Sequence, residues 1–379
     1  MVSRTNGDTN GLPRDIYEQM MRQSMRPANE NELAEAVREA SGPLRIVGGG
    51  TRGVGSVSGE VLETGGLAGV TLYEPGALTL VAGAGTPLAE IEALLAGERQ
   101  RLAFEVPDLR GLLGRVGGST LGGMVAANAS GPRRVQVGAC RDAALGVRFV
   151  DGRGEVIKSG GRVMKNVTGY DLVKLLAGSW GTLGVLSEVS LKVQALPEAE
   201  ATLCAPMGIG QAVGAMSAAL GSPFDLSGAA WCGGEVRLRV EGMAGSVAYR
   251  TGSLAGHLGG DWRVVTGTES AVLWREVRDV EPLHKLDGPL WRVAVKPSES
   301  VAVLEGLEGA ALLDWGGGLI WYCGAGDLRG RAAAFGGHAT LLRGEGVAFH
   351  PEAPAVARLT AGLRARFDPR GILNAGLMG

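Results

Sequence analysis

The chain has 379 residues, of which 64 are Gly and 16 are Pro, with 45% hydrophobic residues, 20% charged residues and a formal net charge of −2. The glycine content exceeds the average of about 7% in proteins. The combined content of Gly and Pro stays below the roughly 25–30% that is typical of low-complexity chains, so the composition excludes collagen and disorder. The near-neutral charge argues against nucleic-acid binding, which needs a basic surface, and the length favours two domains.

Helices and strands alternate along the first half of the chain. The apolar spacing predicts a helix at 29–40 and a buried strand at 44–47 that enters a glycine loop. A second helix is expected to begin at Thr86-Pro87 and end at Leu95, with Pro87 in the first helical position. Further strands are predicted at 70–73, 78–82, 145–150, 155–159 and 185–193.

The pattern changes after Leu196-Pro197, because six of the seven Trp residues lie beyond residue 200. We therefore predict a domain boundary near 197. The uncharged stretch 201–224 contains two prolines, so we interpret it as a loop followed by a short buried helix, not as a membrane span. An amphipathic helix is predicted at 354–367, before Asp368-Pro369.

Targeting and cysteine signals are weak. The first 20 residues lack the apolar segment of a signal peptide, which favours a cytoplasmic protein. The four cysteines, Cys140, Cys204, Cys232 and Cys323, form no C-x-x-C pair. The spacing therefore favours reduced structural thiols, and we predict no zinc site and no iron–sulfur cluster held by this chain alone.

The first candidate site is the segment 44–55, LRIVGGGTRGVG. A strand that runs into consecutive glycines can direct backbone N–H groups at one point and bind a phosphate or pyrophosphate. The same glycines satisfy G-x-G-x-x-G, but a Rossmann site needs a helix directly after the loop, and 54–59 has no helical period. A simple turn remains an equal alternative for this segment alone.

Two more glycine-rich segments follow. The segment 116–132 has no charge until residue 133 and could pass close to a flat ligand, or it could be a buried Gly/Ala helix packed on a sheet. The segment 178–185 contains Trp180, which could be a platform or a core residue. Between them, Lys165, Asn166, Tyr170 and Asp171 could bind a polar ligand or hold a polar loop.

Taken together and in this order, the three segments resemble the FAD-binding domain of the vanillyl-alcohol oxidase/p-cresol methylhydroxylase (PCMH-type) superfamily. More narrowly, RVMKNVTGYDLVKLLAGSWGTLGVLSEVSLKV and the ending RFDPRGILNAG resemble the FAD-binding E subunits of glycolate oxidase (glycolate dehydrogenase). The resemblance covers about 27–197 and 349–376 and is weak between.

The resemblance implies an α+β fold with a two-subdomain PCMH-type FAD-binding domain, a smaller α+β, ferredoxin-like cap, and a C-terminal segment that returns to the FAD domain. The implied parts are a polar lead at 1–26, the FAD domain at 27–197, a cap for substrate or partner at 198–353, and a C-terminal helix and flavin-contacting tail at 354–379.

The resemblance also implies non-covalent FAD and assigns residues to it. The first loop would contact the pyrophosphate, the second segment the ribityl and flavin region, the third the adenine side, and the C-terminal tail the flavin. The residues are Val47, Gly48, Gly49, Gly50, Thr51, Arg52, Gly53, Pro107, Asp108, Gly117, Gly118, Ser119, Gly122, Gly123, Asn128, Gly181, Gly184, Val185 and Asn374.

Two departures from the family pattern concern the tail and the chemistry. Asn374 is followed by Ala375 where the family usually has Pro. Related 2-hydroxy-acid dehydrogenases hold a metal through Gly-Glu-His-Gly and paired His residues, whereas this chain has Gly346-Val347-Ala348-Phe349-His350. We therefore predict no metal site and leave the catalytic residues open, with Arg52, Tyr170 and His350 as candidates.

The function implied by the resemblance is that of an FAD subunit in a glycolate-oxidising complex. The α-hydrogen of the 2-hydroxy acid would pass to flavin as hydride, and the hydroxyl proton to a base. Electrons would pass to an iron–sulfur subunit. The complex would also contain an FAD-binding catalytic subunit, and its partners could attach it to a membrane. The alternatives are a non-catalytic electron-relay or assembly subunit and a free-standing FAD-dependent 2-hydroxy-acid dehydrogenase.

Overall fold

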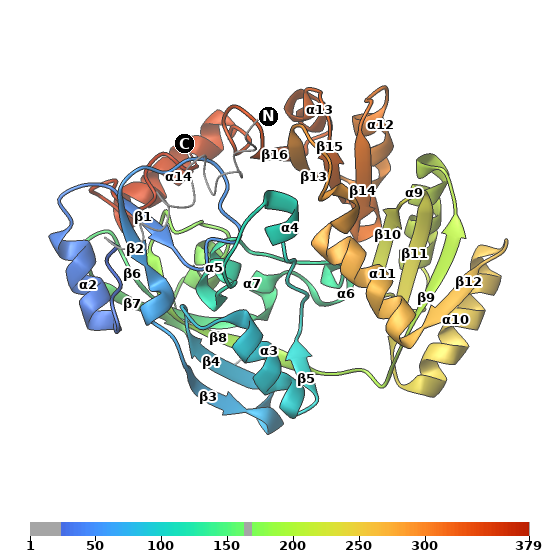
Figure 1. Cartoon of the computed structure of the whole chain (residues 1–379), viewed down its shortest axis with the longest axis horizontal. Helices are drawn as coiled ribbons and strands as arrows, with labels where there is room; N and C mark the ends of the chain where they lie inside the picture. Colours follow the sequence, from blue (N-terminus) through green and yellow to red (C-terminus); the bar gives the residue numbers. More distant parts are fainter. Residues whose placement is uncertain (1–23, 163–168, 379) are drawn as a thin grey trace, which may run out of the picture.

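The computed structural model describes residues 24–162 and 169–378, which form two halves side by side (Figure 1). We call the elements from α2 to β8, with the C-terminal segment from α14 on, the first half. Its elements are α2 (Glu30–Glu39), β1 (Leu44–Val47), β2 (Glu60–Glu63), β3 (Val70–Glu74), β4 (Thr79–Gly83), α3 (Leu88–Gly97), β5 (Gln100–Leu102), α4 (Arg110–Leu113), α5 (Leu121–Ala126), α6 (Arg134–Val137), α7 (Cys140–Ala143), β6 (Ala144–Val150), β7 (Val156–Gly160), α8 (Leu172–Leu176), β8 (Val185–Ala195) and α14 (Pro354–Phe367).

The local predictions for this half are confirmed to within one or two residues. Asn29 caps α2, because its side-chain oxygen accepts from the backbone N–H of Glu32 at 3.0 Å. One detail was wrong: Pro87 is the residue before α3, and the helix begins at Leu88. The rigid ring of Pro87 therefore sets the entry to the helix and not its first turn.

The main sheet of the first half has the strand order β3-β4-β8-β6-β7, and β5 pairs with the end of β8. Helices α3, α5, α7 and α8 contribute to one apolar core with these strands, which includes Ile91, Phe104 and Phe149. The strands β1 and β2 form a separate parallel pair and share a second core with α2.

The C-terminal tail returns to β1, as the fold prediction expected. The N–H of Leu44 donates to Ile372 O at 2.7 Å, and the N–H of Asn374 donates to Leu44 O at 3.0 Å. Leu373 is buried in the same core as α2. The last residues therefore lie against the strand that leads into the first glycine loop.

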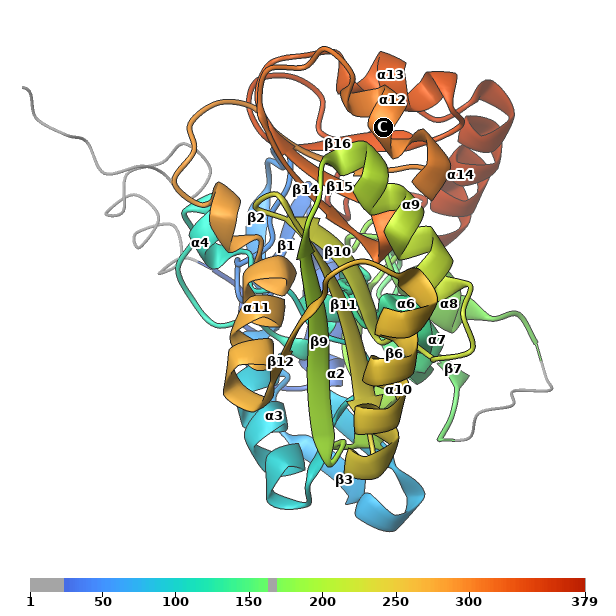
Figure 2. The ribbon, with the colours of Figure 1, turned by 90° about the vertical axis from the view of Figure 1, so that its right-hand side faces the viewer.

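The second half runs from β9 to β16 and forms an eight-stranded sheet in the part of the chain that the structure describes (Figures 1 and 2). Its elements are β9 (Ala199–Pro206), α9 (Ile209–Leu220), β10 (Gly228–Cys232), β11 (Glu235–Gly242), α10 (Ala244–Leu258), β12 (Arg263–Thr266), α11 (Gly267–Asp279), β13 (Leu290–Ala294), α12 (Ser300–Leu304), β14 (Ala310–Asp314), β15 (Leu319–Cys323), α13 (Leu328–Ala334) and β16 (His338–Arg343).

The strand order of this sheet is β12-β9-β11-β10-β14-β15-β13-β16, with all neighbours antiparallel. The chain order β9-α9-β10-β11-α10-β12 is a β-α-β-β-α-β unit of ferredoxin-like type, and β13-α12-β14-β15-α13-β16 is another. The second half therefore consists of two such units, whose edge strands β10 and β14 pair with each other. The ferredoxin-like cap expected from the sequence thus contains two ferredoxin-like units.

The two faces of this sheet have different neighbours. One face forms a core with α9, α10, α12 and α13. The opposite face carries Leu290, Leu312 and Trp321, which share a core with α11 and with Leu112 of the first half. That second face is therefore the one that meets the first half.

The interpretation of 201–224 as a loop and a short helix was wrong at its start. Residues 199–206 form β9, which pairs with both β11 and β12, and only α9 matches the expected helix. Pro206 ends the strand, because proline cannot continue a ladder. The four cysteines are buried and unpaired. Within the described ranges, none of the helices combines the length and hydropathy that crossing a membrane requires.

Candidate functional site

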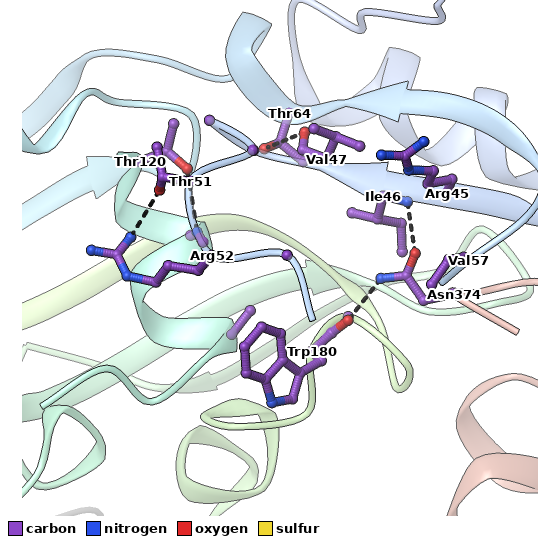
Figure 3. A pocket seen from close by; sticks show the side chains of 18 of the residues that line it. Arg45, Ile46, Val47, Thr51, Arg52, Val57, Thr64, Thr120, Trp180 and Asn374 are labelled. Carbon is purple, nitrogen blue, oxygen red and sulfur yellow. Dashed lines mark hydrogen bonds between the residues drawn. The ribbon is translucent and has the colours of Figure 1, made fainter. Parts of the chain in front are cut away.

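A groove in the first half is lined by residues from all three glycine-rich segments and from the C-terminal tail. It contains about 1180 Å³ of space free of protein atoms, counted to its open mouth. Figure 3 shows the first loop running across it, with Asn374 joined by dashed lines to Ile46 of β1 and to Trp180. The segments that line it lie up to about 330 positions apart in the sequence but share one wall.

The first glycine loop offers backbone donors to this groove. Within the described residues, none of the N–H groups from Gly48 to Gly53 donates to a protein acceptor. Thr51 and Arg52 are buried, and buried N–H groups without an acceptor are rare in proteins. A row of free N–H groups in a turn is suited to an anion such as a pyrophosphate, so the loop fits the diphosphate of a dinucleotide.

The first and second glycine segments touch where a side chain would not fit. A Cβ on Gly49 would lie 1.5 Å from the carbonyl oxygen of Gly118, and one on Gly48 would lie 2.5 Å from Thr120 Oγ1. A Cβ on Gly122 would likewise lie 2.7 Å from the Cβ of Ala84. Close packing of the backbone therefore requires glycine at these positions.

Arg52 ties the first loop to two other segments. Its guanidinium donates to Ser119 Oγ and, at 2.9 Å, to the carbonyl of Pro107. Its Nε has no partner among the described residues. Burial is the largest effect on its pKa and lowers it to about 10, so the group remains charged at neutral pH. A buried positive charge in the groove wall would favour a negatively charged ligand.

Asn374 joins the tail to both sides of the groove (Figure 3). Its Oδ1 accepts from the N–H of Ile46 at 2.8 Å, and its Nδ2 donates to the carbonyl of Trp180 at 2.7 Å. Its backbone has a φ of 44°, which asparagine tolerates better than most residues. The amide therefore fixes the end of β1 relative to the turn that carries Trp180.

Replacement of Asn374 by Ala should weaken ligand binding in the groove about tenfold without unfolding the chain. The change leaves the Ile46 N–H and the Trp180 carbonyl without partners, which costs about 1–3 kcal/mol per buried group. The measurement is FAD affinity by fluorescence titration. Asn374→Asp keeps the oxygen that accepts from the N–H of Ile46, so this variant should lose less FAD affinity than Asn374→Ala. An unchanged affinity in both variants would remove Asn374 from the site.

The structure brings most of the predicted residues to the groove and places others behind it. The lining includes Val47, Gly48, Gly49, Gly50, Thr51, Arg52, Gly53, Gly122, Gly123, Gly181, Gly184, Val185 and Asn374. Three other predicted residues do not line the groove but contact residues that do. Pro107 and Ser119 accept hydrogen bonds from Arg52, and Gly118 packs against Gly49. Gly117 is packed against the carbonyl of Gly49.

Asp108, Asn128, Tyr170 and His350 do not line the groove. The Asp108 carboxylate pairs with Arg110 at 2.6 Å, and Asn128 Oδ1 accepts from the N–H of Arg141 at 3.1 Å. Tyr170 is 90% exposed. Nδ1 of His350 accepts from the N–H of Ala339 at 3.3 Å, although its neighbour Phe349 packs against Trp180. The candidate ligands Lys165 and Asn166 lie outside the described residues.

Sequence reasoning missed several lining residues. Thr120 caps α5 by accepting from the N–H of Gly123, and a threonine directly before a helix is a signal that could have identified it. Trp180 had been left as either a platform or a core residue, and it lines the groove. Other lining residues lie inside the predicted segments 44–55 and 116–132 but were not assigned individually: Arg45, Ile46, Val54, Gly55, Val116 and Ala126. No local signal marks the rest, which are Val57, Thr64, Arg115, Leu186 and Leu377.

Two of the alternatives left open by the sequence are now decided. No helix follows the first loop in the described chain between Gly48 and β2, so the Rossmann arrangement is absent. The second segment forms α5, which is both packed on β4 and β8 and exposed to the groove at Gly122, Gly123 and Ala126. Both interpretations of that segment therefore hold at once.

Comparisons with known proteins agree with this geometry. A family model described as "FAD binding domain" matches residues 22–160. The glycolate oxidase subunit GlcE of Escherichia coli K12 is 35% identical over 326 residues, which cover 85% of this chain and 88% of that protein. The glycolate oxidase subunit GlcD of Bacillus subtilis 168 is 41% identical over 87 residues, only 23% of this chain and 18% of that protein.

A solved structure of alkyldihydroxyacetonephosphate synthase superposes with a TM-score of 0.67 at 15% identity, over 93% of this chain and 76% of that one. At that identity the likeness shows the fold alone. The mixed α+β fold is thus the expected PCMH-type FAD-binding fold, and FAD is the cofactor that the matched domain takes.

Proposed function

Because the chain belongs to the family of the glycolate oxidase subunit GlcE, we propose that it is the FAD-binding subunit of a complex that oxidises glycolate or a similar 2-hydroxy acid. The observation that carries the proposal is the groove, in which free N–H groups of the first loop lie between two further glycine segments. When bound, FAD supplies the acceptor for the hydride of the substrate α-carbon.

The chain's own residues bind and orient the cofactor in this proposal. The loop 47–53 would hold the diphosphate through backbone N–H groups, with Arg52 adding a fixed positive charge. Gly122 and Gly123 would let the ligand approach the backbone of α5, and Asn374 would keep the groove at its width. We also propose the boundaries 27–197 for the FAD-binding part, 198–353 for the cap and 354–379 for the tail.

The proposed assembly contains an FAD-binding catalytic subunit and an iron–sulfur subunit. Support for partners comes from the relatives, which are named as subunits. A second candidate function, an electron-relay subunit without its own substrate chemistry, is favoured by one observation: neither Tyr170 nor His350 lines the groove.

One experiment separates the two functions. We expect the purified chain to contain FAD and its visible flavin absorbance to bleach when glycolate is added without oxygen. Bleaching by the chain alone would exclude the pure relay function. Bleaching only after the partner subunits are added would exclude a free-standing dehydrogenase. A purified, folded chain that takes up no FAD would overturn the proposal itself.

A further inference from the structure

Two arginines from opposite halves of the molecule lie against one indole ring. Trp315 follows β14, and its Nε1 donates to the carbonyl of Gly131 in the first half at 3.0 Å. The Cζ of Arg134, on α6, lies 4.3 Å from the centre of that ring, and the Cζ of Arg292, on β13, lies 5.3 Å from it. Arg292 also lies 5.9 Å from the ring of Trp321, its neighbour on β15.

Among the described residues, these two guanidinium groups have no partner for their hydrogen bonds. Across the described residues, neither Arg134 nor Arg292 has an ion pair or a hydrogen-bond acceptor for its side chain. Each group is charged and offers five donors. Both side chains are partly buried, and none of their guanidinium nitrogens is among the buried side-chain atoms without a partner, so an anion from solvent can reach them. An anion from outside the chain would accept from donors that no described residue uses.

The other arginine–tryptophan stacks of the same sheet provide an internal comparison. Arg239 lies over Trp274 and donates to Glu105 at 2.8 and 3.0 Å. Arg329 lies over Trp291 and donates to backbone carbonyls, one of them Ala348 at 3.0 Å. Stacking on tryptophan therefore does not by itself explain why Arg134 and Arg292 are left unpaired.

Two acidic side chains act on the charges of this pair, Asp142 on Arg134 and Asp314 on Arg292. Asp142 accepts from the N–H of Ala139 at 2.9 Å. Asp314 precedes Trp315 and accepts from its N–H at 2.7 Å. Burial raises the pKa of Asp314 to about 8, so the carboxyl is mainly uncharged at pH 7. Burial, and then the neighbouring Arg134, lower the pKa of Arg292 to about 10, which leaves it charged at the same pH.

The pair lies where the two halves meet. Arg134 is on α6, which contacts β10 of the second half. Arg292 pairs in register with Trp321, on the sheet face that meets the first half. The two charges therefore lie at the seam between the halves.

We propose that Arg134 and Arg292 form a binding site for a small carboxylate, with Trp315 as its floor. Guanidinium groups match carboxylates in geometry and can bond to both oxygens, and a site built from both halves would hold the ligand at their seam. Taking the ligand to be the carboxylate end of the 2-hydroxy acid rests on the proposed function. The anion site itself rests only on the unpaired arginines.

The test uses the FAD-loaded chain and oxalate, a dicarboxylate without a hydrogen to transfer, so that binding is measured without turnover. Isothermal titration calorimetry should show binding to the unmodified chain. Arg292→Met and Arg134→Met should each weaken it about tenfold or more, because a charged partner is lost. Arg329→Met, the matched control, removes an arginine from a tryptophan ring elsewhere on the sheet and should leave oxalate affinity within about twofold.

Several outcomes would overturn the site. These are the absence of oxalate binding to the unmodified chain, unchanged affinity in both Met variants, and inorganic phosphate that binds as tightly as oxalate. Should Arg292→Met lose the visible flavin spectrum, Arg292→Lys replaces it and is expected to bind oxalate more weakly than the unmodified chain. Normal oxalate binding with no bleaching by glycolate would leave this site standing and count only against the proposed chemistry.

Discussion

Replacement of Gly49 by Ala should reduce the affinity for FAD roughly tenfold to a hundredfold. The new Cβ would lie 1.5 Å from the carbonyl oxygen of Gly118 and 2.6 Å from its carbonyl carbon, so the loop or the second segment must move. Overpacking of this kind costs about 1–3 kcal/mol. Displacement of the loop would move the N–H groups of Gly48 to Gly53 away from the position in which we propose that they hold the diphosphate.

The measurement is the ratio of visible flavin absorbance to protein, with far-ultraviolet circular dichroism as the check on folding. Gly76→Ala is the control outside the groove, because a Cβ there would meet no atom within 4 Å. This variant should keep FAD nearly as well as the unmodified chain. A Gly49→Ala protein that keeps its full flavin content would show that the contact with Gly118 does not set the shape of the groove.

Arg239→Met should lower the free energy of unfolding by about 3–5 kcal/mol, the cost of breaking a buried ion pair from one side. Arg239 is 1% exposed and donates with both terminal nitrogens to Glu105, across the seam between the halves. Next to it, Glu241 of β11 pairs with Arg133 and Arg101 of the first half at 3.0 and 2.6 Å. Ion pairs in which arginines and glutamates alternate thus hold β11 against the first half.

Urea unfolding followed by tryptophan fluorescence measures this change. The control is Arg263→Met, because Arg263 is half exposed and its pair with Glu269 should contribute less than about 1 kcal/mol. Equal losses in the two variants would contradict the special role of the seam.

The same network predicts how stability depends on pH. Burial by itself would raise the pKa of Glu105, but Arg239 and Arg133 outweigh burial and lower the pKa to about 2 from its ordinary 4.5. A carboxyl whose pKa is lower in the folded state than in the unfolded state makes its full contribution to stability at a pH above the unfolded-state pKa. That contribution is lost as the pH falls toward the folded-state pKa. The unmodified chain should therefore lose stability between about pH 4.5 and 2, and Arg239→Met should lose less over that range.

The local part of the fold could be predicted because short-range chemistry controls it. Asn29 predicts where α2 begins, and the apolar run at 44–47 matches β1 residue for residue. The first glycine loop could be recognised only together with the other two glycine segments, because three successive glycines after a strand could equally form a simple turn. The wrong prediction at 199–206 has a physical cause as well. The segment consists largely of small residues without a helical period, so the sequence alone favours a loop, and only the pairing with β11 and β12 makes it a strand.

The site could be predicted only in outline. Pro107 and Ser119 were expected at the ligand, but they hold Arg52 from behind. Trp180 and Thr64 reach the groove because separate segments fold onto it. Which side chain of a loop faces a cavity depends on the packing of distant elements, and neighbouring residues in the sequence carry no information about that.

The sequence by itself determined where the backbone must pass without side chains: three glycine segments, each beside a strand, in an order suited to a long flat dinucleotide. Tertiary structure decided which distant groups meet there. Glu105 and Arg239 are 134 positions apart, Ile46 and Asn374 are 328 apart, and Arg134 and Arg292 share one indole. Glycine requirements follow from local backbone sterics, whereas such pairings depend on strand order and register, which only the assembled sheets specify.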